Sequence, residues 1–182
     1  VWVVVRDAYS QTAYEYFEIN VLEKAIPLNL TATLVNENLI GGLAGDKLTG
    51  NQYANTLDGG LGKDTLIGGL GNDRYVLDVN ARGKYEDKVV ELTDQGNDTL
   101  VYRNESLTAQ NSAVKLTLAK NFENLDISQT GTMNFKLTGN SVDNILTGNN
   151  GNNVIDYVLL SKVILDNIHK FSQHRHTKFM NL

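Results

Sequence analysis

The chain has no cysteine and a single proline, and these shortages limit how it can be held together. Without cysteine, neither disulfide bonds nor thiolate metal sites contribute to the fold. No apolar run approaches the roughly 20 residues that a membrane span requires. The chain begins with Val1 rather than Met, so we expect it to be a fragment or processed piece of a longer protein.

Positive charge is also scarce, with 16 Lys and Arg against 21 Asp and Glu and a net charge of -5. An acidic balance disfavours nucleic acid and anionic membrane surfaces as partners and suits cations. The length of 182 residues fits one domain or two small ones. Catalytic patterns such as HExxH and GxSxG are lacking, so we expect no enzymatic activity in this piece, although the parent protein could be an enzyme.

Glycine, by contrast, is abundant beside regularly placed aspartate, as in GGLGKDTLIGGLGNDRY at 59–75. Such loops bring the backbone close to a charge, which could be a phosphate or a cation. A P-loop requires Ser or Thr after Gly-Lys, but here Asp64 follows Lys63, and its carboxylate would repel a phosphate. Thr65 stands where a dinucleotide motif needs its third glycine, and no helical segment follows to present a helix N-terminus. The loops therefore favour a cation.

The glycine-rich segment repeats every nine residues: GGLAGDKLT (41–49), GNQYANTLD (50–58), GGLGKDTLI (59–67) and GGLGNDRYV (68–76). The sixth position holds Asp46, Asn55, Asp64 and Asp73, and the eighth holds Leu48, Leu57, Leu66 and Tyr75. A short strand in each unit points the eighth side chain inward, and the glycines permit tight reversals. With two units per coil, Asp46 stacks on Asp64 and Asn55 on Asp73. The pattern predicts an all-β fold, a parallel β-roll or β-solenoid of stacked half-turns.

These units resemble GGxGxDxUx, the calcium-binding nonapeptide of RTX (repeats-in-toxin, hemolysin-type) proteins, over about residues 35–156. The resemblance implies Ca²⁺ as the cofactor. Calcium takes six to eight oxygens, many of them backbone carbonyls, which explains both the glycines and the aspartates. The expected metal-site residues are Gly41, Leu43, Gly45, Asp46, Asn55, Asp58, Gly59, Leu61, Gly62, Asp64, Gly68, Leu70, Gly71 and Asp73.

Two alternatives stay open for these residues. Glycine and aspartate are also ordinary turn residues, and a solenoid could use them without metal. Against this, Asp46 and Asp64 stacked without a cation would repel each other. Asp58, at the ninth position, is either a further calcium ligand or a solvated turn residue.

The repeats divide the chain into five segments. Residues 1–26 alternate like a hairpin, either the end of a truncated cadherin-like or immunoglobulin-like β-sandwich or a solenoid cap. A linker at 27–36 precedes the calcium-binding roll at 37–80 and degenerate rungs at 81–156. In the rungs at 136–156, asparagine takes the sixth position, so we expect them to be metal-free.

The tail at 157–182 lacks the repeat and has apolar residues at helical spacing. It is either a secretion signal or the product of a disrupted reading frame. Its three histidines, His169, His174 and His176, are more often a polar tail than a zinc site.

Function follows from the coupling of metal binding to folding. Glycine-rich rungs lose much backbone entropy on ordering, and stacked aspartates repel, so the roll should fold only with calcium. The resemblance implies a secreted or cell-surface bacterial protein exported by type I secretion machinery. The parent is expected to be an adhesin or another non-catalytic exoprotein; alternatively it is a hydrolase, protease, epimerase or pore-forming toxin whose active part lies elsewhere. An ice-binding solenoid would need a long threonine ladder, which the sequence lacks.

Overall fold

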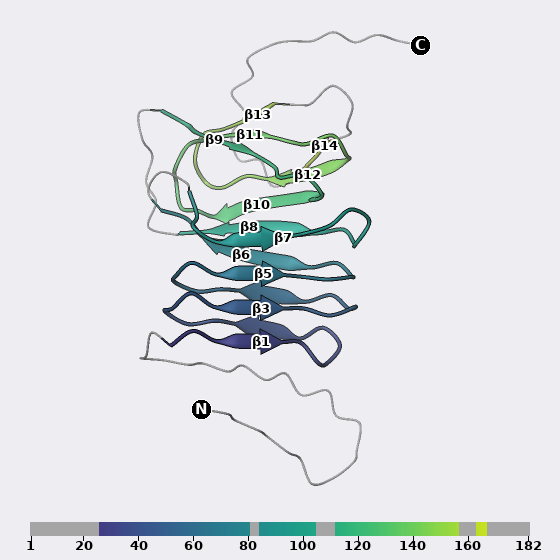
Figure 1. Cartoon of the computed structure of the whole chain (residues 1–182). Helices are drawn as coiled ribbons and strands as arrows, with labels where there is room; N and C mark the ends of the chain where they lie inside the picture. Colours follow the sequence, from purple (N-terminus) through teal and green to yellow (C-terminus); the bar gives the residue numbers. More distant parts are fainter. Residues whose placement is uncertain (1–25, 81–83, 105–111, 157–162, 167–182) are drawn as a thin grey trace.

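The computed structural model describes residues 26–80, 84–104, 112–156 and 163–166. Within these ranges every regular element is a strand, and every strand pair is parallel. The chain climbs as a flattened coil whose turns stack from β1 at one end to β13 and β14 at the other (Figure 1). The predicted all-β solenoid is confirmed.

Alternate strands form the two faces of the coil. One face is a continuous seven-stranded sheet, and the other is divided into a four-stranded and a three-stranded sheet. The continuous sheet contains β2 (Asn38–Ile40), β4 (Thr56–Asp58), β6 (Arg74–Asp78), β8 (Thr99–Arg103), β10 (Asn124–Gln129), β12 (Asn144–Thr147) and β14 (Val163–Asp166). The divided face contains β1 (Asn29–Thr31), β3 (Lys47–Thr49), β5 (Thr65–Ile67) and β7 (Lys88–Val90), then β9 (Val114–Thr117), β11 (Phe135–Thr138) and β13 (Asn153–Asp156).

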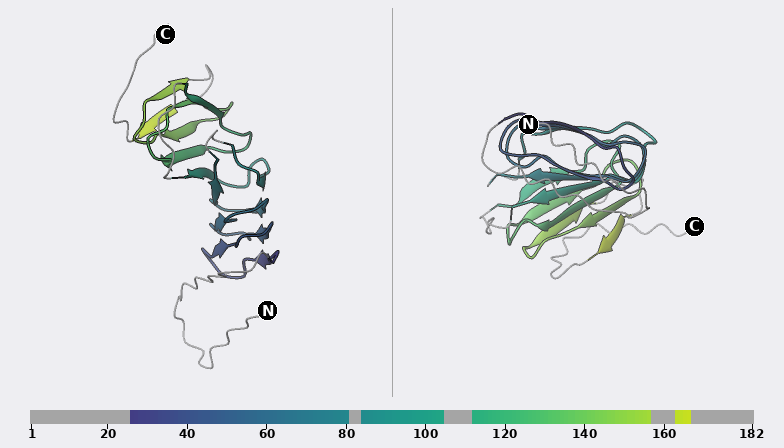
Figure 2. Two further views of the ribbon diagram at one scale, coloured as in Figure 1. Left: turned by 90° about the vertical axis from the view of Figure 1, so that its left-hand side faces the viewer. Right: turned by 90° about the horizontal axis from the view of Figure 1, so that it is seen from below.

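The register shows where the nine-residue period holds and where it ends. Strand β3 pairs with β5 so that Leu48 lies beside Leu66, a spacing of 18 residues, and Leu57 lies beside Tyr75 in the same way. Beyond this the spacing lengthens to 25 residues between β6 and β8. Figure 2 shows the consequence: the 18-residue turns form a narrow, straight stack, and the longer turns are wider and displaced sideways.

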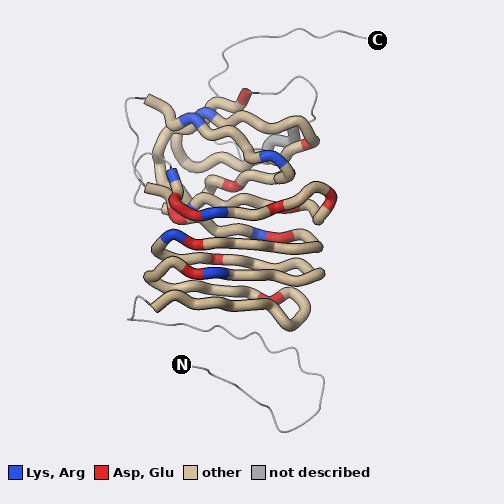
Figure 3. Tube along the Cα trace, viewed as in Figure 1, with Lys and Arg blue, Asp and Glu red and all other residues tan. Residues whose placement is uncertain are grey.

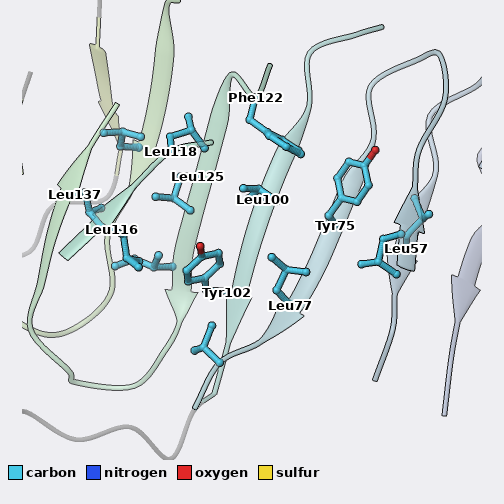
Figure 4. Close-up of a cluster of buried hydrophobic side chains, with 14 of the residues drawn as sticks. Leu57, Tyr75, Leu77, Leu100, Tyr102, Leu116, Leu118, Phe122, Leu125 and Leu137 are labelled. Atoms are coloured by element: carbon cyan, nitrogen blue, oxygen red, sulfur yellow. The ribbon is translucent and has the colours of Figure 1, made fainter. Parts of the chain in front are cut away.

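The core lies between the two faces and is built from the eighth position of each unit. In β4 and β5 the central leucine is completely buried while its neighbours are only partly covered, because side chains alternate across a strand. In the wider turns aromatic side chains join the leucines, and Figure 4 shows Tyr75, Tyr102 and Phe122 among them. There Tyr75 meets Phe122 edge to face, with ring centroids 5.4 Å apart. The core thus gains aromatic rings beside its leucines as the coil widens.

The linker predicted at 27–36 is wrong, because this stretch contributes the first rung of the solenoid. Strand β1 pairs with β3 and places Leu30 beside Leu48, one full coil earlier. The amide of Leu28 also donates to Asp46 Oδ1 at 2.7 Å. The stretch lacks glycine, so the motif does not reveal it, but the spacing of its leucine from Leu48 fits the coil.

The remaining expectations for the two ends are only partly covered by the described residues. The hairpin at 1–26 lies outside them, apart from Ile26, as do the three tail histidines. Residues Val163–Asp166, within the tail given a helical pattern, form β14 and pair with β12. Their β-branched Val and Ile favour a strand. In the described part of the chain, no helix is long and apolar enough to cross a membrane.

The alternation in β12 gives a test of the core. Leu146 is fully buried, whereas its neighbour Ile145 is 38% exposed. We expect Leu146→Ala to lower the free energy of unfolding by about 2–5 kcal/mol, because it removes packed methyl groups and leaves a cavity. The matched change Ile145→Ala should cost less than about 1 kcal/mol. Urea unfolding in calcium-containing buffer measures both, and equal losses would contradict the assigned inner face.

Candidate metal centre

The two loops that match the nonapeptide in full lie at opposite edges of the coil. Residues 59–64 lead into β5 on the divided face, and residues 68–73 lead into β6 on the continuous face. Each loop therefore places its aspartate, Asp64 or Asp73, immediately before a buried strand. Figure 3 shows acidic positions lying one above another in successive turns at the edge on its left. The predicted stacking of positions eighteen apart is thus present in the fold.

One oxygen of each stacked carboxylate ties its turn to the turn before it. Asp64 Oδ1 accepts the amide of Asp46 at 2.7 Å, and Asp73 Oδ1 accepts the amide of Asn55 at 2.7 Å. The same bond recurs above, where Asp87 Oδ1 accepts the Asp64 amide at 3.1 Å and Asp98 Oδ1 accepts the Asp73 amide at 2.8 Å. These bonds form two acidic ladders, one at each edge of the coil.

The second oxygen distinguishes the full repeats from the imperfect ones. Asp64 Oδ2 and Asp73 Oδ2 are buried and have no hydrogen-bond partner. In the preceding loops the corresponding atoms are satisfied: Asp46 Oδ2 accepts the Gly42 amide at 2.6 Å, and Asn55 Oδ1 accepts the Asn51 amide at 2.8 Å. A buried carboxylate oxygen without a donor is costly unless a cation meets it. Asp64 and Asp73 therefore fit the calcium that the repeat implies.

The two full loops also contain glycines with positive φ angles, which the loop at 41–46 lacks. The second residue of each full loop has a positive φ, 77° at Gly60 and 102° at Gly69, as does the fourth, 137° at Gly62 and 105° at Gly71. L side chains rarely adopt these angles, so the loop shape depends on glycine.

The first glycine of each unit is required by space. A Cβ on Gly59 would lie 2.3 Å from Asp64 Oδ2, and a Cβ on Gly68 would lie 2.2 Å from Asp73 Oδ2. A Cβ on Gly41 would lie 2.5 Å from Asp46 Oδ2. Gly45 likewise lies close to a neighbouring turn, with Lys63 O 2.8 Å from its Cβ position. Glycine thus lets the loop backbone close directly over the acidic side chain.

The electrostatics of the ladders favour a cation. The pKa of Asp64 is raised to about 7, chiefly by burial and also by the nearby carboxylates of Asp87 and Asp46, against the opposing hydrogen bond from the Asp46 amide. Burial also raises the pKa of Asp73. A raised pKa means that the charged form is disfavoured in the absence of a counter-ion. A bound divalent cation would reverse that balance.

The other predicted residues take different positions. Leu43, Leu61 and Leu70 point their side chains outward and are more than half exposed, so any contribution to a metal site comes from their backbone. Asp58 is neither a free ligand nor a solvated turn residue. Both of its oxygens accept from the Arg103 guanidinium, at 2.6 and 2.9 Å, and Arg103 also binds Asp78. The arginine lies two turns away on the same sheet, a contact that the local motif could not reveal.

Three further acidic residues lie at the ladders although the repeat pattern did not predict them as site residues. Asp87 and Asp98 continue the ladders, and Glu91 is buried beside Asp73. Asp98 could have been predicted from the sequence, because it occupies the sixth position of the partial repeat DQGNDTLVY (94–102). Asp87 could not have been predicted in this way, because 23 residues rather than 18 separate it from Asp64.

A parallel β-roll whose edges carry buried acidic ladders defines a class of repeat protein built around bound cations. The RTX calcium-binding nonapeptide repeat matches the chain in four copies, over residues 40–75 and 137–156. Residues 40–75 and 137–156 of the chain therefore contain RTX nonapeptide repeats, which are of the calcium-binding kind. No curated protein and no solved structure matches it.

Substitution of Asp64 separates a metal ligand from a structural turn residue. We expect Asp64→Asn to raise the stability of the calcium-free fold, because it removes a buried charge beside like charges. In excess calcium the same variant should lose up to about 2.7 kcal/mol, the stabilisation from one site at a hundredfold excess over Kd. Thermal unfolding in calcium and the β-sheet signal that remains in chelator measure the two signs. Asp94→Asn, at an exposed loop position, is the control. A change of the same sign in both buffers would contradict a ligand role.

The raised pKa of Asp64 predicts competition between protons and calcium. Below about pH 7 the carboxyl is protonated, so calcium must displace a proton, and its apparent affinity should fall by up to about tenfold per pH unit. Without calcium the sign is opposite. Folding raises the pKa from 3.8, so Asp64 contributes stability at low pH that is lost as the pH rises through about 7. Calcium titrations at about pH 8 and about pH 6 measure the shift, which Asp64→Asn should reduce.

Proposed function

We propose that this chain is a calcium-dependent folding module of a secreted bacterial exoprotein, which orders when it meets extracellular calcium after type I export. The observation that carries the proposal is the pair of buried, unpartnered oxygens on Asp64 and Asp73. Both belong to loops that match the calcium-binding repeat. Ordering these loops without a cation buries charge that nothing else in the described structure neutralises, so calcium binding and folding are coupled.

The magnitudes suit a switch between compartments. Extracellular calcium modules bind with Kd on the order of 10⁻⁴ to 10⁻³ M, well above the calcium concentrations of a cytosol. At a hundredfold excess over Kd each site adds about 2.7 kcal/mol to folding, and this contribution vanishes when the ion is scarce. Stability in a solenoid is close to a sum over neighbouring turns, so two or more sites decide whether the stack forms. The chain would then remain unfolded for passage through an export channel.

The module itself acts by binding and folding rather than by catalysis. Its acidic side chains lie in ladders whose oxygens accept backbone amides, and this arrangement serves structure and ion binding. We place it in an adhesin or another non-catalytic exoprotein, on the strength of the sandwich-like alternation at 1–26 and the long run of further turns. Sandwich repeats encoded upstream would support this placement, whereas an upstream zinc or serine motif would make the parent an enzyme.

Circular dichroism of the whole chain tests the coupling. With chelator we expect a spectrum of largely unfolded chain, and millimolar calcium should produce a β-sheet spectrum because the ions offset the buried carboxylates. Magnesium at the same concentration is the control, since it prefers a smaller, more rigid shell and keeps its waters. A β-sheet spectrum that chelator leaves unchanged would overturn the proposed role.

A further inference from the structure

A second acidic cluster lies where the 18-residue period ends, and it includes residues that are not part of a full repeat. Asp73, Glu91 and Asp98 each offer a carboxylate oxygen, and these oxygens all lie within 4.8 Å of one another. The three residues are 1%, 8% and 1% exposed. None of the ion pairs between described residues includes any of them.

The register of the strands explains how the cluster forms. Ile67 pairs with Val90, so Glu91 stands one turn above Gly68, the first glycine of the preceding loop. Arg74 pairs with Thr99, so Asp98 stands one turn above Asp73. A glutamate thus occupies a position where the repeat has glycine, and its side chain enters the space beside the acidic ladder. The repeat itself supplies no carboxylate there.

The donors around the cluster are too few for its oxygens. Tyr75 donates its hydroxyl to Glu91 Oε2, and that hydroxyl accepts the Gly68 amide at 2.8 Å. Glu91 Oε1 accepts the Leu92 amide at 3.1 Å, and Asp98 Oδ1 accepts the Asp73 amide at 2.8 Å. With the Asn55 amide, which donates to Asp73 Oδ1, three amides and one phenol therefore face the six oxygens of three carboxylates.

The oxygen left without a donor points into the cluster. Asp73 Oδ2 is buried and unpartnered, although its residue is 1% exposed. Asp73 Oδ2 and the Tyr75 hydroxyl oxygen both lie 2.2 Å from the position that a Cβ on Gly68 would take, so they are neighbours. Because that hydroxyl binds Glu91, the unpartnered oxygen faces the Tyr75–Glu91 pair. This is the arrangement that a cation between the carboxylates would complete.

We propose that Asp73, Glu91 and Asp98 hold a calcium-sized divalent cation at the junction between the regular and the lengthened turns. Hard oxygen ligands and three negative charges select a divalent ion of this kind. Two oxygens on opposite sides of a calcium ion are separated by about 5 Å, and the cluster falls within that span. Tyr75 acts as a positioning residue that holds Glu91 through its hydroxyl. The site shares Asp73 with the ladder on which the proposed function rests, and what it adds is Glu91, a ligand outside the full repeats; it can bind an ion in a chain that is already ordered, so the two proposals can be tested apart.

Isothermal titration of the full chain with calcium tests the site through Glu91→Gln. Glutamine keeps an oxygen for the Tyr75 hydroxyl but removes the charge, so we expect one ion to be lost or bound at least about tenfold more weakly. The control is Glu86→Gln, in the same segment but with its side chain 66% exposed, which should leave the isotherm unchanged. An isotherm for Glu91→Gln identical to those of the control and the parent chain would overturn the proposal.

Terbium gives a second readout because a tyrosine lies at the site. Terbium replaces calcium at oxygen sites, and excitation of a nearby tyrosine sensitises its emission. Tyr75→Phe should reduce this emission while the number of bound ions stays the same, and Glu91→Gln should reduce both. Should Glu91→Gln lose its β-sheet spectrum in calcium, Asp98→Asn takes its place, since an asparagine oxygen can still accept the Asp73 amide. Emission unaffected by either charge-removing variant would count against the site.

The two proposals fail separately. A β-sheet spectrum that ignores chelator, together with an ion lost on Glu91→Gln, would overturn the folding role and support the junction site. Calcium-dependent folding with no effect of Glu91→Gln on the isotherm would do the reverse. Excess magnesium should not displace terbium from the junction, and complete displacement would overturn the assignment of a calcium-sized ion.

Discussion

The arrangement of the loops depends on carboxylates that must do two things at once while buried. One oxygen of Asp64 or Asp73 accepts an amide from the turn eighteen residues earlier and holds the two turns in register. The other oxygen lies inside the loop with no protein donor. An uncharged amide can perform the first task but offers a cation much less for the second. In the two loops that match the repeat in full, a single aspartate therefore holds adjacent turns together and also offers an oxygen to a cation. Glycine is needed in these loops because the backbone passes very close to the aspartate side chain.

The later turns keep the solenoid fold but carry asparagine where the earlier repeats carry aspartate. At Asn144 the side-chain oxygen accepts the Asn140 amide at 2.8 Å, and the side-chain nitrogen lies 3.3 Å from the Glu123 carbonyl. Asparagine thus satisfies its own loop and bonds to the previous turn without a charge to neutralise. Asn149, also buried, donates to Thr130 and Met133. These hydrogen bonds account for the survival of the repeat phase in a region where aspartate has largely been lost.

The sequence pattern predicted the features that depend on local spacing. The strand positions at 47–76, the inward leucines and the stacking of positions eighteen apart all follow from the nine-residue period, because each is set within a coil or between adjacent coils. Features that depend on insertions or distant residues could not be predicted. Arg103 reaches Asp58 over 45 residues of sequence, and Glu91 reaches the acidic ladder only because the preceding turn is longer. The first strand was missed because Leu30 keeps the spacing but lacks the glycines that mark a repeat.

The two faces of the coil differ in continuity, and this gives the rod a direction of flexure. On one face the backbone hydrogen bonds run without interruption through seven strands, parallel to the long axis. On the other face, in the described part of the chain, the bonding stops after β7 and resumes at β9. Tension applied between the two ends would be borne by the unbroken face, link by link, and bending would open the other face at the gap. In the described part of the chain, we therefore expect bending at the break between β7 and β9, which lies beside the junction where the turns lengthen.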